Sequence, residues 1–205
     1  MMDDVERAVW LAERAGKLTA SRMRDALNFK TDGTPSQKRS DYMRDLLAER
    51  LTGMTTRNFV SPAMEWGIQQ EDAAKVMYET TTGIPLRESR FYEHKTIENF
   101  GATPDGEIDH DGLIETKCPT TGTFIGWVMA GVVPPEYKPQ MIAQLLCTGR
   151  RYVTFVAFDP RLKEVKRQLF VREFVPTEEE LWNTTIGAQQ FLDELDAMFD
   201  AFVTA

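Results

Sequence analysis

Short β-prone segments separated by turns occupy the middle of the chain and constrain its fold more than any other feature. Residues 88–118 divide into RFYEHKTI, GATPDGEID and LIETKC, with a tight H-D-G turn at 110–112. Two further β-prone runs follow, at 152–158 and 165–174. Segments with helical spacing lie on both sides of these strands. This order predicts one α/β domain with a central mixed β-sheet flanked by helices.

The helices are delimited by capping residues. Gly53 is a typical C-cap, and Ser61 with Pro62 forms a typical helix start. Thr177 and Glu180 have the spacing of a capping box. A chain of 205 residues suits one core better than two, so we expect a single domain over 1–205 that includes the helix of 177–205. Helices are expected at 19–28, 40–51, 62–83, 120–131, 137–148 and from 177 onward.

Composition excludes several classes of protein. With 42% hydrophobic residues, the chain has enough apolar side chains to form a core. No apolar run approaches the roughly 18 to 20 residues that cross a bilayer, so no membrane association is expected. Two cysteines make neither a disulfide framework nor a zinc site. We therefore expect a soluble, cytoplasmic protein.

The net charge of −8 is concentrated in parts of the chain. A negative protein is at first sight a poor partner for nucleic acid, because DNA binding depends on neutralising phosphates. The last thirty residues, however, carry 7 acidic and no basic side chains, which leaves −1 for residues 1–175. We therefore expect the terminal helix to lie outside any DNA path, solvated or docked on a basic patch of a partner. Basic candidates for phosphate contacts are Lys30, Lys38, Arg39, Arg150 and Arg151.

The strongest chemical motif pairs Thr103-Pro104-Asp105-Gly106 with Glu115-Thr116-Lys117 ten residues later. Side chains two apart in a strand share a face, so Glu115 and Lys117 should project together, with Asp105 close by. Two carboxylates suit Mg²⁺, and a neighbouring lysine can orient water or offset phosphate charge. The pattern indicates metal-assisted hydrolysis of a phosphodiester; the alternative is a solvated hairpin with a surface ion pair. Glu71, on the helix of 62–83, is either an exposed acid or a third carboxylate of this site.

Six blocks in order then resemble a known family. They are L-T-A-S (18–21), W-G-x-Q-x-E (66–71), T-P-D-G (103–106), E-T-K-C-P (115–119), Q-M-I-A-Q-L-L-C-T-G (140–149) and F-D-P-R (158–161). Together they resemble the phage lambda exonuclease, or YqaJ-type alkaline exonuclease, family of the PD-(D/E)xK nucleases. The resemblance implies a bacterial or phage-encoded 5′-to-3′ exonuclease. Such an enzyme would use Mg²⁺, or Mn²⁺ as a substitute, to release 5′-mononucleotides from double-stranded DNA. The remaining 3′ single strand would serve recombination by strand annealing.

The resemblance also implies roles for individual residues. Asp105, Glu115 and the Thr116 backbone carbonyl match the metal ligands. Arg14 and Ser21 match the groups that receive the 5′-phosphate of a DNA end; the alternative for Arg14 is a surface arginine. Met64 matches an apolar wedge that separates the terminal base pairs, although a core methionine is the alternative. The matched catalytic residues are Lys117, Glu115, Asp105, Glu71 and Gln140.

A ring-shaped homotrimer and a single-strand annealing partner are further implications of the resemblance. Two other functions stay open on the sequence: a DNA-end-binding recombination adaptor that does not cleave, and an endonuclease of the same fold. The intact Asp105, Glu115 and Lys117 favour an enzyme over an adaptor. The Arg14 and Ser21 matches favour an enzyme directed to ends.

Overall fold

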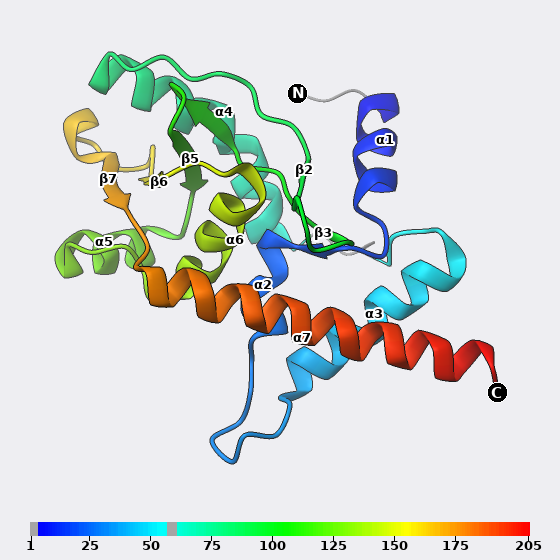
Figure 1. The fold of residues 1–205 in the computed structure, drawn as a ribbon. Coiled ribbons are helices and arrows are strands. Elements are labelled where there is room, and N and C mark those ends of the chain that lie inside the picture. The colour runs from blue at the N-terminus through cyan, green and yellow to red at the C-terminus, as the bar shows by residue number, and fades with distance from the viewer. Residues whose placement is uncertain (1–3, 57–60) are drawn as a thin grey trace.

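A four-stranded mixed sheet forms the centre of the computed structural model, which describes residues 4–56 and 61–205 (Figure 1). Its strands are β4 (Gly106–Ile108), β5 (Gly112–Lys117), β6 (Tyr152–Phe158) and β7 (Leu169–Phe174), in the order β4-β5-β6-β7. Within this sheet, β5 and β6 are parallel and the other two pairs are antiparallel. A parallel pair needs a long crossover, and α5 (Thr121–Ala130) and α6 (Lys138–Thr148) supply it. The predicted α/β class with a mixed sheet is confirmed.

Alternating side chains of this sheet pack on two different layers. Leu113 and Phe155 face α5 and α6, in a cluster with Met141. Their neighbours Ile114 and Val156 face the other way and pack with Tyr78 of α4 (Pro62–Thr82). Because the strands alternate, Glu115 and Lys117 fall on the α6 side, while Thr116 falls on the α4 side. The end of β5 therefore lies between two helices that both carry predicted site residues.

A second, three-stranded sheet was not expected. It has the order β1-β3-β2, from β1 (Leu18–Thr19), β3 (Phe100–Ala102) and β2 (Tyr92–Glu93). The helix predicted from residue 19 begins later, as a 3₁₀ turn (Ala20–Arg22) followed by α2 (Met23–Ala26). The reason is tertiary: Leu18 and Thr19 pair in parallel with Phe100 and Gly101, a long-range contact that local spacing does not indicate.

The capping predictions are confirmed. Helix α3 (Gln37–Thr52) ends at Gly53, whose φ of 70° is left-handed. It begins before the predicted residue 40 because the Ser36 hydroxyl accepts a bond from Arg39 N. Helix α4 starts at Pro62, and α7 (Glu178–Val203) starts with a complete capping box between Thr177 and Glu180. None of the described helices is long and apolar enough to cross a membrane.

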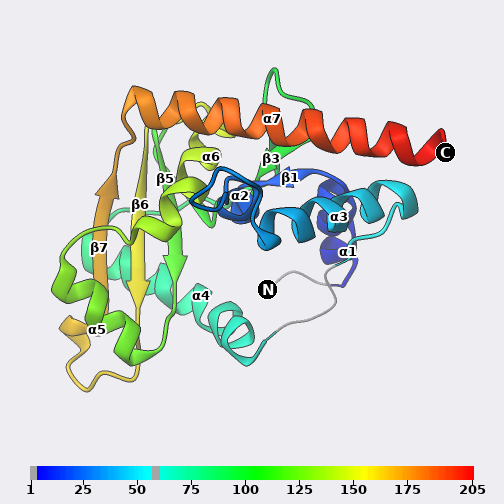
Figure 2. The same cartoon turned by 90° about the horizontal axis from the view of Figure 1, so that it is seen from below.

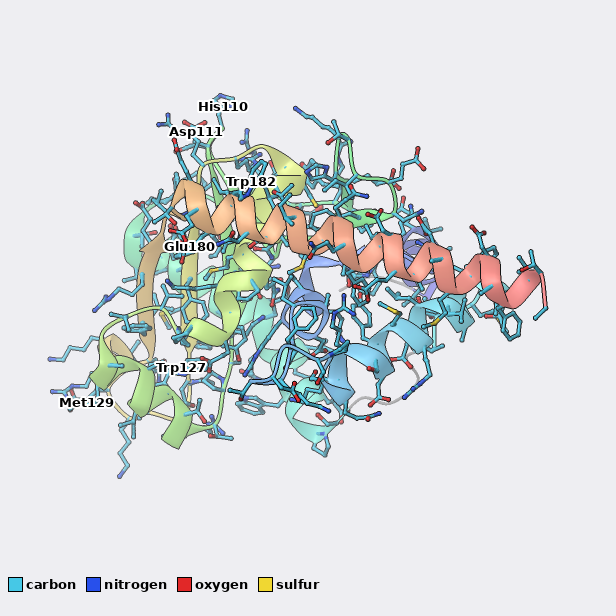
Figure 3. The ribbon with its side chains drawn as sticks, turned by 60° about the horizontal axis from the view of Figure 1, so that its bottom comes forward. His110, Asp111, Trp127, Met129, Glu180 and Trp182 are labelled. Carbon is cyan, nitrogen blue, oxygen red and sulfur yellow. The ribbon has the colours of Figure 1, made fainter. Side chains whose placement is uncertain are left out.

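Helix α7 lies along the molecule, from one end of the four-stranded sheet past α6 and α2 to α3 (Figure 2). Its buried side, which includes Phe191 and Leu195, closes the cluster formed by α2, α3 and β3. Glu180 and Trp182 belong to its first turns, and Trp182 is exposed (Figure 3). Three of its acids pair with basic side chains of this same chain rather than with solvent alone: Glu180 with Lys138, Glu194 with Arg39, and Asp196 with Arg50.

Candidate active site

The end of β5 places two of the predicted residues in direct contact. The Lys117 ammonium donates to Glu115 Oε1, and both side chains face α6, as their alternation requires. From α6, Gln140 Nε2 donates to the same Oε1 at 2.7 Å. The Glu115 side chain is completely buried, whereas that of Lys117 is 26% exposed. Glu115 is therefore an anchored carboxyl group, and Lys117 extends from it toward the surface.

A second glutamine of α6 holds the other oxygen of Glu115. Gln144 Nε2 donates to Glu115 Oε2 at 2.5 Å, and Gln144 is itself fully buried. The sequence reasoning did not assign Gln144 a role. Its position four residues after Gln140 could have indicated one, because residues i and i+4 share a helix face. Both oxygens of Glu115 are thus satisfied by α6, which agrees with the rule that a buried charge needs partners.

Asp105 is fixed against the same strand from the other side. Its Oδ2 accepts bonds from Thr116 N at 2.6 Å and from the Thr116 hydroxyl at 2.7 Å. Within the described part of the chain, Oδ1 accepts no bond and remains able to take a ligand. The T-P-D-G segment therefore does not form a detached solvated hairpin. It sits beside β5, with its carboxylate close to Glu115 and Lys117.

The electrostatics of the cluster follow from burial and from two carboxylates lying close together. Burial and then the Asp105 charge raise the pKa of Glu115 to about 7, against the opposing effect of Lys117. Burial works to lower the pKa of Lys117, but the charges of Glu115 and Asp105 outweigh it and raise that pKa. The Lys117 ammonium also lies 5.2 Å from the ring centroid of Tyr137, which precedes α6. In this state Lys117 is a cation that offsets the carboxylates.

Glu71 of α4 lies near the cluster without joining it. Its carboxylate accepts a bond from Lys75 at 2.7 Å. Burial, and then the negative charge of Asp105, raise the pKa of Glu71. Lys75 is a second cation near Asp105 that the sequence reasoning did not find. Burial and the Glu71 charge raise the pKa of Cys118 to about 12, so the thiol next to Lys117 stays protonated and is no nucleophile.

The donor set fits a hard divalent cation. Among the described residues, no group of three or more His, Cys, Asp or Glu side chains forms a complete metal cage. Mg²⁺ does not need one, because it is often held by one or two carboxylates and keeps several waters. Asp105 has an oxygen without a bond in the described structure, and Glu115 is a buried carboxylate whose charge a cation would stabilise. Asp105, Glu115 and the Thr116 carbonyl are the residues that would hold it.

Arg14 and Ser21, predicted to bind phosphate, contact each other, and Arg14 also contacts Thr103. Arg14 Nη2 donates to the Ser21 hydroxyl at 3.4 Å, and Nη1 donates to the Thr103 hydroxyl at 3.1 Å. Trp10 Nε1 donates to the same hydroxyl at 3.2 Å. The Arg14 guanidinium carbon lies 4.2 Å from the centroid of the Trp10 ring, over its face. Thr103 was not predicted as a site residue, although it belongs to the T-P-D-G block. Because it lies two residues before Asp105, its Cα is at most roughly 7 Å from that of Asp105.

Two predicted phosphate contacts are wrong. Arg39 is 2% exposed; its guanidinium pairs with Glu194 and donates to the carbonyl of Ala26 at 2.9 Å. Arg150 pairs with the buried Glu107. Both arginines are structural because tertiary ion pairs occupy them. Lys30, Lys38 and Arg151 are exposed, as the prediction requires. The side chain of Met64, the predicted wedge, lies outside the described residues.

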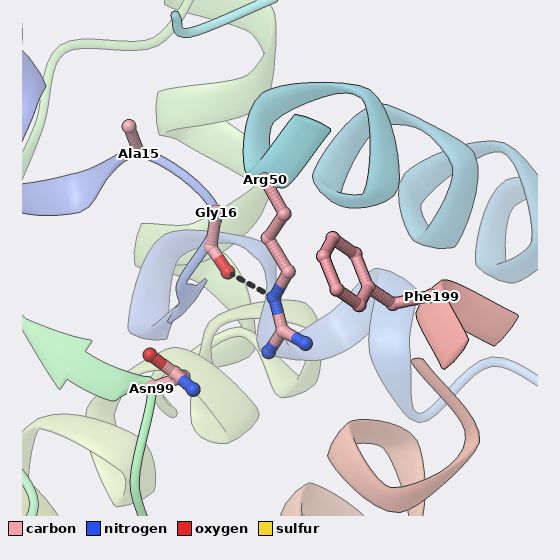
Figure 4. Close-up of a pocket in the computed structure, with 5 residues that line it drawn as sticks. All are labelled: Ala15, Gly16, Arg50, Asn99 and Phe199. Carbon is pink, nitrogen blue, oxygen red and sulfur yellow. Dashed lines mark hydrogen bonds between the residues drawn. The ribbon is translucent and has the colours of Figure 1, made fainter. Parts of the chain in front are cut away.

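The cavity in Figure 4 is separate from the carboxylates. It measures about 260 Å³ and is lined by Ala15, Gly16, Arg50, Asn99 and Phe199. Arg50 Nε donates to the Gly16 carbonyl at 3.0 Å and ties the segment after α1 (Asp4–Arg14) to α3. None of the predicted site residues lines this cavity. The chemistry-bearing side chains gather instead at the end of β5.

The fold and this cluster define a class of protein. It is an α/β protein with two carboxylates and a lysine at the end of a central strand, an arrangement suited to hydrolysing phosphodiesters. The family model of the YqaJ-like viral recombinase domain matches residues 9–151. The chain therefore belongs to the YqaJ-like viral recombinase domain family, which confirms the resemblance. No curated protein matches the sequence.

Solved structures agree with this family. The structure is similar to an alkaline exonuclease (LHK-Exo) from Laribacter hongkongensis, with a TM-score of 0.87 and 35% identity over 96% of both chains. A complex of LHK-Exo with dAMP matches with a TM-score of 0.87 and 36% identity over 95% of both chains. A phage-related exonuclease from Haemophilus somnus 129PT shares the fold, with a TM-score of 0.62 and 16% identity over 89% of this chain and 96% of that one. The chain is a nuclease, a hydrolase of phosphodiester bonds.

Proposed function

We propose that this DNA exonuclease digests double-stranded DNA in the 5′-to-3′ direction, starting from a 5′-phosphorylated end. It releases 5′-mononucleotides with Mg²⁺ and leaves a 3′ single strand for strand annealing. The observation that carries the proposal is the contact of Arg14 with Ser21 and with Thr103, which lies two residues before Asp105 in the chain. A guanidinium fork with two hydroxyl groups is well suited to a terminal phosphate, which carries more charge than an internal one.

The closeness of Thr103 and Asp105 in the chain supports removal of one nucleotide at a time. The Thr103 hydroxyl accepts a bond from Arg14, and Thr103 lies two residues before Asp105. A phosphate held at Arg14 would place the next phosphodiester toward the carboxylates, because successive phosphates of one strand lie a few ångströms apart. LHK-Exo, similar to this chain over nearly its whole length, has been solved in complex with dAMP, a deoxynucleoside monophosphate. That complex is consistent with mononucleotides as products.

Catalytic roles follow from the contacts. Asp105 and Glu115 would hold the cation, which would supply Lewis-acid chemistry to the site. Gln140 and Gln144 keep Glu115 oriented. Lys117, partly exposed, offsets the charge that builds on the phosphate and orients the attacking water. Glu71 and its partner Lys75 lie on the side of the site that faces α4.

The assembly expected from the family resemblance is part of the proposal. A homotrimer would surround the duplex and allow long digestion with few sequence contacts. A single-strand annealing protein would receive the exposed 3′ strand. The mass of the purified protein, measured by light scattering, tests the first point; a monomeric mass at working concentration would contradict it.

The decisive experiment compares DNA ends. Linear duplex with a 5′-phosphate or a 5′-hydroxyl is incubated with Mg²⁺, with Mn²⁺ or with a chelator, and closed circular DNA is included. We expect mononucleotide release from the phosphorylated end, slower release from the hydroxyl end, activity with either metal and none with the chelator. Labels at each end of the duplex report the polarity.

Other outcomes would identify the alternatives. Cutting of the closed circle would show an endonuclease. Tight binding to ends without release of nucleotides, in either metal, would show a non-cleaving adaptor. Release that begins at the 3′ end would contradict the proposed direction and the role of the Arg14 pocket together.

A further inference from the structure

The F-D-P-R block of residues 158–161 has no role in the site described so far. The register of the parallel strands places it precisely enough to ask what it does. Lys117 is opposite Ala157 across the β5–β6 pair. Two residues further along each strand are Pro119 and Asp159, so both segments leave the sheet at the same edge. The D-P-R turn therefore lies next to the exit of the strand that carries Lys117.

Arg161 connects this turn to two other elements. Its backbone N and Nε donate to Asp159 Oδ1 at 3.1 and 2.6 Å. Its Nη2 donates to the Pro119 carbonyl at 2.6 Å. Its guanidinium lies 4.8 Å from the ring centroid of Trp66, in the first turns of α4. One side chain thus contacts the end of β6, the exit of β5 and α4.

The partners of Arg161 are close in sequence to the predicted catalytic residues. Pro119 is two residues after Lys117, and Trp66 is five residues before Glu71 on the same helix. A planar guanidinium can donate in its plane and stack on an aromatic face at the same time, which a lysine cannot do.

The turn that presents Arg161 is itself fixed. Asp159 is fully buried, and its backbone N donates to the Gln168 carbonyl at 2.9 Å. Gln168 Nε2 donates to the carbonyls of Pro160 at 3.1 Å and Leu162 at 2.7 Å. Burial opposes the charge of Asp159, but hydrogen bonds from Arg161 and Thr121 outweigh it and keep its pKa below the usual value. Arg161 is therefore held by the charged carboxylate of a turn that is itself fixed by hydrogen bonds.

We propose that Arg161 is a positioning residue for the cleavage reaction: it fixes the Lys117-bearing exit of β5 against α4, and Asp159 holds it in place. The inference rests on the proposed function. It assigns Arg161 a role that does not require contact with DNA. Because the side chain is 43% exposed, direct binding of a DNA phosphate is the competing role that the experiment has to separate.

The test uses Arg161→Lys and Arg161→Ala. Two quantities are measured: the single-turnover cleavage rate with Mg²⁺, and the Kd for a 5′-phosphorylated duplex end without metal. We expect both variants to cleave between about 10-fold and about 100-fold more slowly, because small displacements of catalytic groups cost that much. The Kd and the KM should stay within about twofold, since positioning acts on the chemical step rather than on binding. Arg161→Lys keeps the charge and loses the fork and the stack, so it should not restore the rate.

Matched variants complete the design. Arg167→Ala removes an exposed arginine of the same connection, which pairs with Glu164, and should change neither quantity. Asp159→Asn keeps the shape but weakens the hold on Arg161, and should slow cleavage in the same way. Combined with Arg161→Ala, it should add little further loss, since the two residues act as one unit. Melting temperatures identify any variant that fails to fold, and Asp159→Asn then provides the test.

The outcomes separate the two claims. If the wild-type chain releases no nucleotide from phosphorylated ends, the proposed function fails, whatever Arg161 does. If the wild type cleaves and Arg161→Ala cleaves equally fast, the positioning role alone is overturned. Recovery of the rate by Arg161→Lys, or a weaker Kd with an unchanged single-turnover rate, would also overturn it and would show a charge contact with DNA.

Discussion

Replacing Gln144 by leucine tests whether α6 prepares Glu115 for catalysis. The donor from Gln144 is the one that reaches Glu115 Oε2, because the bonds from Lys117 and Gln140 both go to Oε1. Gln144→Leu keeps nearly the same volume and removes that bond. A hydrogen bond to a charged group contributes about 1.5 to 3 kcal/mol. If the whole contribution is lost in the transition state, cleavage slows by about 10-fold to about 150-fold.

Stability should change less than the cleavage barrier in this variant. Gln144 Oε1 is buried and has no partner in the described structure, so replacing it by a methyl group removes a desolvation cost. That gain opposes the loss of the bond to Glu115. The melting temperature of Gln144→Leu measures the balance. The same substitution at the exposed Gln189 of α7, which donates to Asp193, is the control.

The assay is single-turnover release of a labelled 5′-terminal nucleotide at saturating enzyme, over a series of Mg²⁺ concentrations. We expect the maximal rate to fall and the Mg²⁺ concentration at half-maximal rate to rise, because a less oriented Glu115 binds the cation more weakly. A change of less than about threefold in both quantities would refute the reasoning. It would mean that Gln140 and Lys117 orient the carboxylate without help.

Four further substitutions have distinct expected outcomes. Lys117→Ala should abolish turnover and retain end binding in a gel-shift assay; substantial residual cleavage would contradict the catalytic assignment. Arg14→Ala should remove the preference for a 5′-phosphate over a 5′-hydroxyl in a competition assay, and Thr103→Val should cause a smaller loss. An unchanged preference in both variants would count against phosphate binding at Arg14 and Thr103. Arg39→Met should lower the free energy of unfolding in urea by about 1 to 3 kcal/mol, because it breaks a bidentate pair whose partner Glu194 is half exposed; an unchanged urea midpoint would argue against this pair as a stabilising contact.

Features set by local chemistry could be predicted from the sequence. Strand β6 occupies the predicted residues 152–158, a β-prone run in which six of the seven residues are buried. Helix α3 ends at Gly53, which adopts the left-handed conformation that glycine favours. The E-x-K motif indicated a shared face for Glu115 and Lys117, and the structure has them in contact.

Features set by distant partners could not be predicted in this way. Strand β1 exists because Leu18 pairs with Phe100, so a stretch with helical spacing begins as a strand. Arg39 looked like an available cation in a polar loop, yet a partner 155 residues away occupies it. The role of Thr103 could not be predicted, because its hydroxyl contacts Arg14 only in the folded chain. The second sheet was not predicted either, because its strands are only two or three residues long.

The ion pairs of α7 have a consequence for how tightly the chain holds DNA that it is not cutting. Each phosphate contact steepens the fall of affinity with salt by about 0.9 in logarithmic slope. Arg39, Arg50 and Lys138 are cations that α7 already neutralises. Without that helix they would be free to hold the DNA backbone at any sequence and any position. By pairing with them, α7 leaves these three cations unavailable for sequence-independent contacts with the DNA backbone.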